Sequence, residues 1–111
     1  MNVATIAFTH AGQTYEGTFT VSTDDKGQLH IELLYKDEDM EGAFFPYAHL
    51  SKSVTFLPQD HFAAKTYSEN EGLVEQFVDT GYFTHTGKSV ESGYLRLPIL
   101  EVTDKFKASF F

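Results

Sequence analysis

The fold is decided by the stretch from Tyr67 to Val102, which reads YSENEGLVEQFVDTGYFTHTGKSVESGYLRLPILEV. Ser68 and Glu71 have the spacing of a capping box, in which each side chain accepts a hydrogen bond from the other residue's backbone amide. Apolar residues then recur with the period of a helix, at Leu73, Val74, Phe77 and Val78. The stretch therefore predicts a helix over about residues 69–80.

The end of this helix and the strand that follows it also have sequence signals. Gly81 can adopt the left-handed conformation of a Schellman ending, and Tyr82 after it is expected to pack on Phe77. The apolar run Tyr94–Val102 predicts a strand. Pro98 interrupts the run, and because proline cannot donate to a strand ladder, we expect a sheet edge or a bulge there.

Residues 3–36 alternate between apolar and polar side chains, which is typical of half-buried antiparallel strands. Two runs carry the alternation, and their inward-facing members are Tyr15, Gly17, Phe19, Val21, Leu29, Ile31, Leu33 and Tyr35. Turn-forming residues separate three such runs, so the segment predicts a three-stranded meander. A fourth strand is expected over Ser53–Leu57, where Pro58 would stop it.

These signals together predict an α+β fold in a single domain spanning residues 1–111. We expect an antiparallel sheet of four to six strands, beginning with the meander, and one main α-helix packed on one face of the sheet. The chain has 111 residues, of which 41% are hydrophobic and 15% aromatic, and this composition argues against disorder.

Composition also excludes several classes of protein. The chain has no cysteine, so it contains neither disulfides nor a thiolate metal site. No apolar run approaches the roughly 18 residues of a membrane-spanning helix, and no signal-peptide pattern precedes the first strand. We therefore expect a cytoplasmic bacterial protein.

Negative charge is concentrated in the middle of the chain, whose net charge is −8. Residues 37–79 contain nine acidic residues and only two basic ones, Lys52 and Lys65. This asymmetry argues against direct binding to nucleic acid, which needs a basic surface. It is compatible with a basic protein partner, with metal ions or with solubility alone. The candidate partner-binding residues are Asp37, Glu38, Asp39, Glu41, Glu71, Glu75 and Asp79.

The last three of these acids follow one another at intervals of four residues, which would place them on the outer face of the predicted helix. Like charges at this spacing cost a helix a few tenths of a kcal/mol for each pair. Such a row is either a solvated face or an acidic stripe retained for a basic partner. The sequence leaves both interpretations open.

Three familiar motifs are incomplete, so the sequence predicts no catalytic residue, metal or cofactor. Gly87-Lys88-Ser89 resembles the end of a phosphate-binding loop, but Tyr82 stands where that loop needs its first glycine. Asp37, Asp39 and Glu41 alternate like the start of an EF-hand, but Ala48 occupies the place of the closing glutamate. The five histidines have no metal-ligand spacing.

The second half of the chain resembles small acidic proteins of bacterial plasmids, conjugative elements and phages. The resemblance is carried by caps and turns, namely Tyr67-Ser68-Glu69-Asn70-Glu71-Gly72, Gly81, Thr86-Gly87, Ser92-Gly93-Tyr94 and Pro98. These families are largely uncharacterised, so the resemblance implies a mobile-element accessory protein and supplies no catalytic residues.

Three functional hypotheses follow from the sequence. The leading one is a non-enzymatic interaction protein, an inhibitor or modulator whose acidic face binds a basic surface of a host protein. The second is a small ligand- or metal-binding protein, or an enzyme, with a cleft between helix and sheet. The third is an oligomeric structural protein that associates through exposed aromatic residues, with candidates Phe44, Phe45, Tyr47, Phe110 and Phe111.

Overall fold

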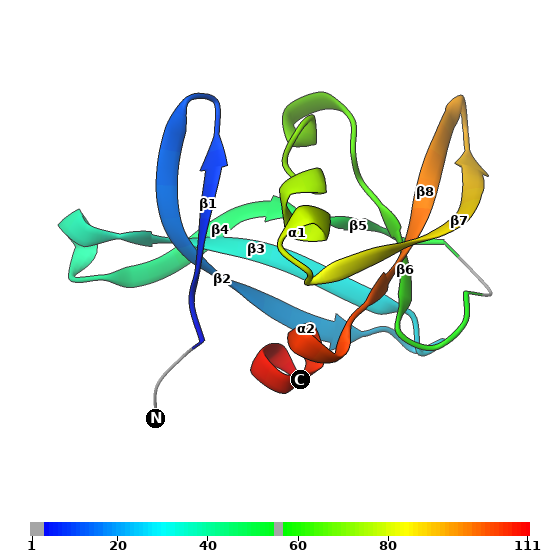
Figure 1. The fold of residues 1–111 in the computed structure, drawn as a ribbon, viewed down its shortest axis with the longest axis horizontal. Helices are drawn as coiled ribbons and strands as arrows, with labels where there is room; N and C mark the ends of the chain where they lie inside the picture. The colour runs from blue at the N-terminus through cyan, green and yellow to red at the C-terminus, as the bar shows by residue number, and fades with distance from the viewer. Residues whose placement is uncertain (1–3, 55–56) are drawn as a thin grey trace.

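The computed structural model describes residues 4–54 and 57–111, which form two four-stranded antiparallel sheets and two short helices (Figure 1). The first sheet has the order β1-β2-β3-β4, with strands Ile6–His10, Gln13–Thr23, Leu29–Asp37 and Ala43–His49. The second has the order β5-β6-β8-β7, and in chain order its strands are Ser51–Lys52, His61–Ala64, Phe83–Ser92 and Leu95–Val102. The helices are α1 (Glu75–Asp79) and α2 (Asp104–Phe110), with 3-10 turns η1 (Glu38–Met40) and η2 (Ser68–Asn70). The single sheet that the sequence predicts is thus two sheets.

The predicted N-terminal meander is confirmed. Strands β1, β2 and β3 pair in chain order, and Phe19 lies opposite Leu33 in the register of β2 and β3. Opposite residues of an antiparallel pair share a face, and both of these side chains are buried. Of the predicted fourth strand, residues 55 and 56 lie outside the described residues, and the nearest described strand is the two-residue β5.

Of the two alternatives predicted at Pro98, a sheet edge or a bulge, the structure shows the second. Strand β8 lies between β6 and β7, so it is not an edge strand. However, its pairing with β6 stops at Ile99, so the missing amide of Pro98 breaks no bond to that neighbour. The register with β7 shifts between His85 and Ser89, which is the expected irregularity, although the extra residues belong to the partner strand. Gly87 lies within this shift with a φ of 81°.

The helix predicted over residues 69–80 is much shorter in the structure, where α1 is five residues long. The capping box does not form: Ser68 has a φ of 59°, and the amide of Glu71 donates to the Ser68 carbonyl instead of its hydroxyl. Asn70 explains the difference. Its buried side-chain amide donates to the carbonyls of His49 (2.7 Å) and Lys65 (3.0 Å), which ties the segment to two distant parts of the chain.

The Schellman hydrogen bonds predicted at the end of the helix are confirmed. The amide of Gly81 donates to the Val78 carbonyl and the amide of Tyr82 to the Phe77 carbonyl, which is the paired bonding of a Schellman motif. The rings of Tyr82 and Phe77 both pack against Phe19. The prediction of one main helix packed on the sheet is therefore only weakly supported. Helix α1 is short, and Phe77 is its one buried residue.

Helix α2 has no counterpart among the elements predicted from the sequence. Thr103 begins the helix, because its hydroxyl oxygen accepts a hydrogen bond from the amide of Phe106. Phe106 is fully buried, and Phe110 packs against Phe19 with ring centroids 4.9 Å apart. Phe106 thus belongs to the core, and Phe110 packs against it.

The two sheets and both helices contribute to one continuous hydrophobic core. The chain passes between the sheets at Leu50, which is fully buried. Its amide donates to the Ile31 carbonyl of the first sheet, and its carbonyl accepts from the amide of Lys65, just after β6. No helix in the described part of the chain has both the length and the apolar character needed to cross a membrane.

The turn between β2 and β3 is held by the Asp24 carboxylate. One of its oxygens accepts hydrogen bonds from the amides of Gln28 and Lys26, each at 2.9 Å, and the other lies 3.3 Å from His30 Nε2. These contacts, the Gln28 bond first among them, hold the pKa of Asp24 below its usual value of 3.8. The ionised carboxylate therefore stabilises the folded state.

Replacing Asp24 with asparagine should therefore change how stability depends on pH. A lowered folded-state pKa contributes stability that is complete above pH 3.8 and is lost as the pH falls through the folded-state value. We expect wild type to melt at a higher temperature than Asp24→Asn at neutral pH, and the difference to shrink as the pH falls below 3.8. Circular dichroism melts across this range measure it. Asp25→Asn, an exposed neighbour, is the control, and an equal loss in both variants would contradict the prediction.

Candidate functional site

Four of the seven candidate acids lie at the tip of the β3–β4 hairpin. Asp37 ends β3, and its side chain caps η1 by accepting a hydrogen bond from the amide of Asp39 at 3.0 Å. The Asp37 carbonyl also accepts from the amide of Gly42 at 3.1 Å, which closes the turn. Glu41 follows η1 with a left-handed φ of 60°. The tip is therefore a bonded turn that presents its carboxylates in a defined arrangement.

One lysine neutralises part of this hairpin. Lys36 Nζ lies 3.1 Å from a Glu16 oxygen on β2 and 3.8 Å from a Glu38 oxygen on η1. The hydrogen bond to Glu16 is the main reason that the pKa of Lys36 is raised. Asp39 and Glu41 are exposed, and neither has a cationic side chain within 4.0 Å among residues 4–54 and 57–111. The outer part of the tip thus carries unneutralised negative charge.

The other three candidate acids do not form the row that the sequence predicts. Glu71 precedes α1, so only Glu75 and Asp79 lie on that helix. A Glu75 oxygen lies 3.1 Å from Nε2 of His85 on β7. The shortened helix is the physical reason for this correction, because the interval of four residues aligns side chains only within one continuous helix.

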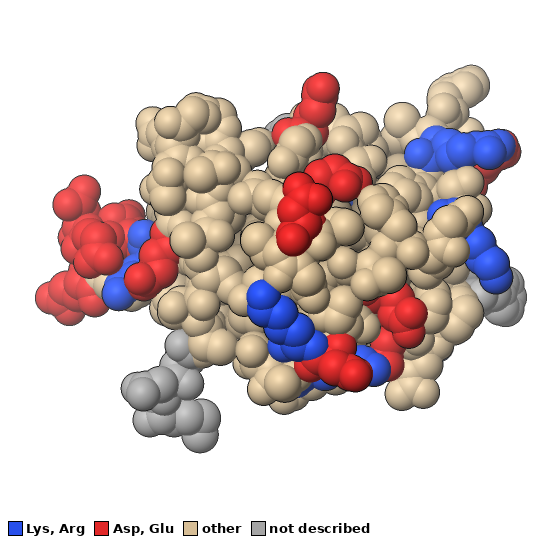
Figure 2. Space-filling model, in the orientation of Figure 1, with Lys and Arg blue, Asp and Glu red and all other residues tan. Residues whose placement is uncertain are grey.

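The two groups of acids are separate on the molecular surface. Figure 2 shows red atoms gathered at the left end, over the β3–β4 hairpin, and again in the middle of the face, over α1. Uncharged surface lies between them in this view. The structure therefore brings Asp37, Glu38, Asp39 and Glu41 together and leaves Glu71, Glu75 and Asp79 apart from them. The hairpin is the denser of the two groups, and we call its four acids the acidic tip.

The described side chains form no group of three or more histidine, cysteine, aspartate or glutamate residues that is arranged to hold a metal ion. At the acidic tip, the resemblance to an EF-hand ends at Gly42, because strand β4 begins at Ala43. Gly87-Lys88-Ser89 lies within β7, where no helix follows it to complete a phosphate-binding loop.

The five aromatic residues proposed for self-association are mostly in contact with the rest of the chain. Tyr47 packs on Phe8 with ring centroids 5.2 Å apart, and Phe45 packs on Tyr35 at 6.2 Å. Phe44 and Phe110 are half-buried. Phe111 is the exposed member of the five, with 61% of its surface accessible.

A polar cluster between β1 and β4 has no signal in the sequence. The Tyr47 hydroxyl lies 2.6 Å from Nδ1 of His10, although the two residues belong to β4 and β1. The ring of Tyr15 packs on Tyr47 at 5.2 Å. Burial is the main reason that the pKa of Tyr47 is raised, and the neighbouring Tyr15 raises it further. Sequence reasoning missed the cluster because its members meet only when the sheet forms.

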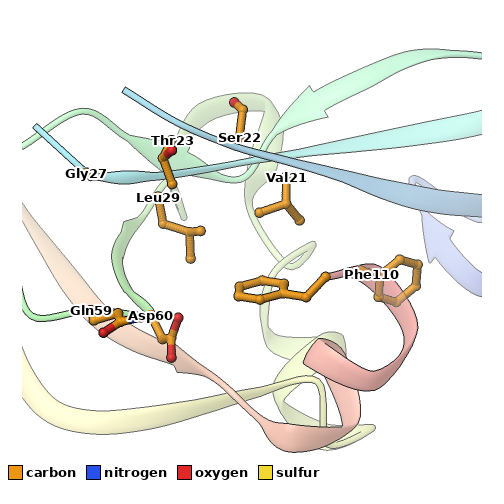
Figure 3. A pocket seen from close by; sticks show the side chains of 9 residues that line it. Val21, Ser22, Thr23, Gly27, Leu29, Gln59, Asp60 and Phe110 are labelled. Atoms are coloured by element: carbon orange, nitrogen blue, oxygen red, sulfur yellow. The ribbon is translucent and has the colours of Figure 1, made fainter. Parts of the chain in front are cut away.

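A hollow of about 520 Å³ also escaped sequence reasoning. It lies between α2 and the end of the first sheet where β2 and β3 join, and Figure 3 shows its lining. The sequence allowed for a cleft between helix and sheet, but no signal placed a helix at the tail or brought the segment before β6 beside it.

The chain matches no protein-family model, no curated protein and no solved structure at a significant level.

Proposed function

We propose that this protein is a small acidic, non-enzymatic interaction protein that binds a basic surface of a host protein through its acidic tip. Its role would be that of an inhibitor or modulator acting in the cytoplasm as an accessory of a bacterial mobile element. The observation that carries the proposal is the arrangement of Asp39 and Glu41, two exposed carboxylates held in a bonded turn away from the described cations.

Electrostatic repulsion within the acidic tip favours a positively charged partner. Like charges placed close together repel one another, and this repulsion is relieved when a positive surface approaches. The bonds from Asp37 to Asp39 and Gly42 hold the turn before any partner arrives, so little ordering is needed on binding. The overall charge of −8 adds attraction at longer range, which raises the rate of encounter.

The group at α1 supports the same proposal less strongly. Asp79 is exposed near the carbonyl end of α1, where helix dipoles favour positive charge instead. The Lys105 ammonium donates to the neighbouring Thr80 carbonyl at 2.6 Å and lies over the Tyr82 ring, so this region has its own cation. We therefore assign α1 a secondary role at most and base the test on the acidic tip.

The test compares two variants that change the net charge equally. Asp39→Lys combined with Glu41→Lys reverses the acidic tip, and Asp25→Lys combined with Glu91→Lys reverses exposed acids elsewhere. A tagged protein is used to capture partners from bacterial host lysate at low and high salt, and the affinity of any captured protein is then measured by titration. We expect one basic protein whose affinity falls about tenfold or more with the first variant at low salt.

The control pair should retain nearly all of the binding, and high salt should weaken the wild-type interaction because it screens exposed charges. Equal losses in the two variants would reduce the effect to net charge and contradict a role for the acidic tip. A partner that binds the reversed tip as tightly as wild type would also overturn the proposal.

A further inference from the structure

The hollow beside α2 has the lining of a small-molecule site. Val21 and Leu29 point toward it from the first sheet (Figure 3), and Phe110 of α2 and the adjacent Phe111 complete its apolar lining. Gln59 and Asp60 form a third side, while the hydroxyl of Ser22 points away (Figure 3). Its volume of about 520 Å³ falls within the range of ligand pockets, which are mostly apolar with a few polar groups.

Asp60 is the acidic residue of this lining. Its side chain is 19% exposed, and one carboxylate oxygen, Oδ2, lies 2.7 Å from Lys107 Nζ on α2. An ionised carboxylate accepts hydrogen bonds on both oxygens, so the pair with Lys107 leaves Asp60 able to accept a further donor.

The surroundings of Lys107 are negative. Asp60, Asp104 and Glu101 all act on Lys107 and raise its pKa, and the hydrogen bond that Lys107 donates to Asp60 has the largest effect. Three carboxylates thus act on one ammonium group, and of these only Asp60 lines the hollow. An anionic ligand in the hollow would be repelled by the Asp60 carboxylate, whereas a cationic one would gain a charge-assisted hydrogen bond to it.

We propose that this hollow binds a small organic amine, with an aromatic or branched aliphatic body against Val21, Leu29 and Phe110 and its ammonium group on Asp60. The body replaces water on apolar side chains, and the Phe110 ring adds a favourable contact for a nearby cation. This site is separate from the acidic tip, and it does not depend on the proposed function.

Asparagine is a suitable replacement for Asp60 because of its backbone conformation. Asp60 has a φ of 66°, a left-handed value that asparagine tolerates better than most residues. The backbone carbonyl of Asp60, which accepts from the amide of Val102 at 3.0 Å, is unaffected by the change. Asp60→Asn therefore removes the charge while it keeps the shape of the site.

The test uses phenethylamine and two matched probes, neutral phenethyl alcohol and anionic hydrocinnamate. Amide chemical shifts of the full chain are followed during titration. We expect phenethylamine to saturate with a dissociation constant on the order of 1 mM, as befits so small a ligand, and to shift Val21, Leu29 and Asp60. The alcohol should bind about fivefold more weakly, and hydrocinnamate more weakly still.

Three variants separate this site from general attraction of amines to an acidic protein. Asp60→Asn should bind phenethylamine about as weakly as wild type binds the alcohol, a loss of about fivefold. Asp39→Asn removes the same charge from the acidic tip and should leave the affinity unchanged. Val21→Phe fills the hollow and should abolish binding, provided that its circular dichroism spectrum matches wild type.

Several outcomes would overturn the proposal. These are equal affinity for the amine and hydrocinnamate, an equal loss in Asp60→Asn and Asp39→Asn, or no saturable shift at the hollow. The same chemistry is present in a peptide, so a blocked arginine–phenylalanine dipeptide is titrated in parallel. Binding of this peptide at the hollow without binding of phenethylamine would also refute a free amine as the ligand.

Discussion

Replacing Phe19 with alanine is expected to lower the free energy of unfolding by about 4 kcal/mol, because it empties the centre of the core. Phe19 is 5% exposed and lies on β2, where its ring meets rings from both helices and from the second sheet. The centroid distances to these partners are 4.9 Å to Phe110, 5.0 Å to Phe77, 5.2 Å to Phe106, 5.8 Å to Phe83 and 6.1 Å to Tyr82.

Urea unfolding followed by circular dichroism measures this loss, which is a large fraction of the roughly 5–15 kcal/mol that stabilises a typical domain. Phe44→Ala is the matched control, since Phe44 is half-buried on β4 and lies outside the core cluster. Phe44→Ala should lower the free energy of unfolding by clearly less than Phe19→Ala. Similar losses in the two variants would show that Phe19 is not the centre of the core.

Replacing Gly17 with alanine is expected to destabilise the protein by about 3 kcal/mol through overpacking. A β-carbon at this position would lie 2.4 Å from the Leu34 carbonyl oxygen and 2.6 Å from a ring carbon of Phe8. The carbonyl belongs to the backbone of β3, which pairs with β2, so it cannot move without disturbing the ladder. Chemical denaturation of the variant measures the cost.

Thr20→Ala is the control for Gly17→Ala, because Thr20 is exposed on the same strand. A surface substitution of this kind should change the free energy of unfolding by about 0.5 kcal/mol or less. If Gly17→Ala lowered the free energy of unfolding by no more than Thr20→Ala, the close approach of β3 to Gly17 would be contradicted.

The sequence predicts the parts of this fold that depend on neighbours along the chain. The alternation of apolar and polar residues correctly assigned Phe19 and Leu33 to the buried face of their strands, because the side-chain period of a strand is local. Gly81 and Tyr82 correctly marked the end of α1, because a Schellman motif is completed by consecutive residues. Both features involve bonds within one element or between adjacent strands.

The errors arise where a distant contact overrides a local preference. Ser68 has a good capping sequence, but Asn70 is bound to carbonyls in two other segments, and these bonds set the backbone instead. The sequence shows which acidic residues are candidates, but their separation into two groups depends on how the hairpin and α1 are placed in space. The hollow was beyond sequence reasoning for the same reason, since Val21, Asp60 and Phe110 meet only in the folded chain.

The position of β8 between β6 and β7 affects how the protein folds during its synthesis. The first sheet consists of hairpins between successive strands, so each strand can pair soon after it leaves the ribosome. In contrast, β6 gains its long partner only after α1, β7 and β8 have all been made. Until then the apolar side chain of Phe62 has only part of its final cover, and the nascent chain is exposed to aggregation during this interval.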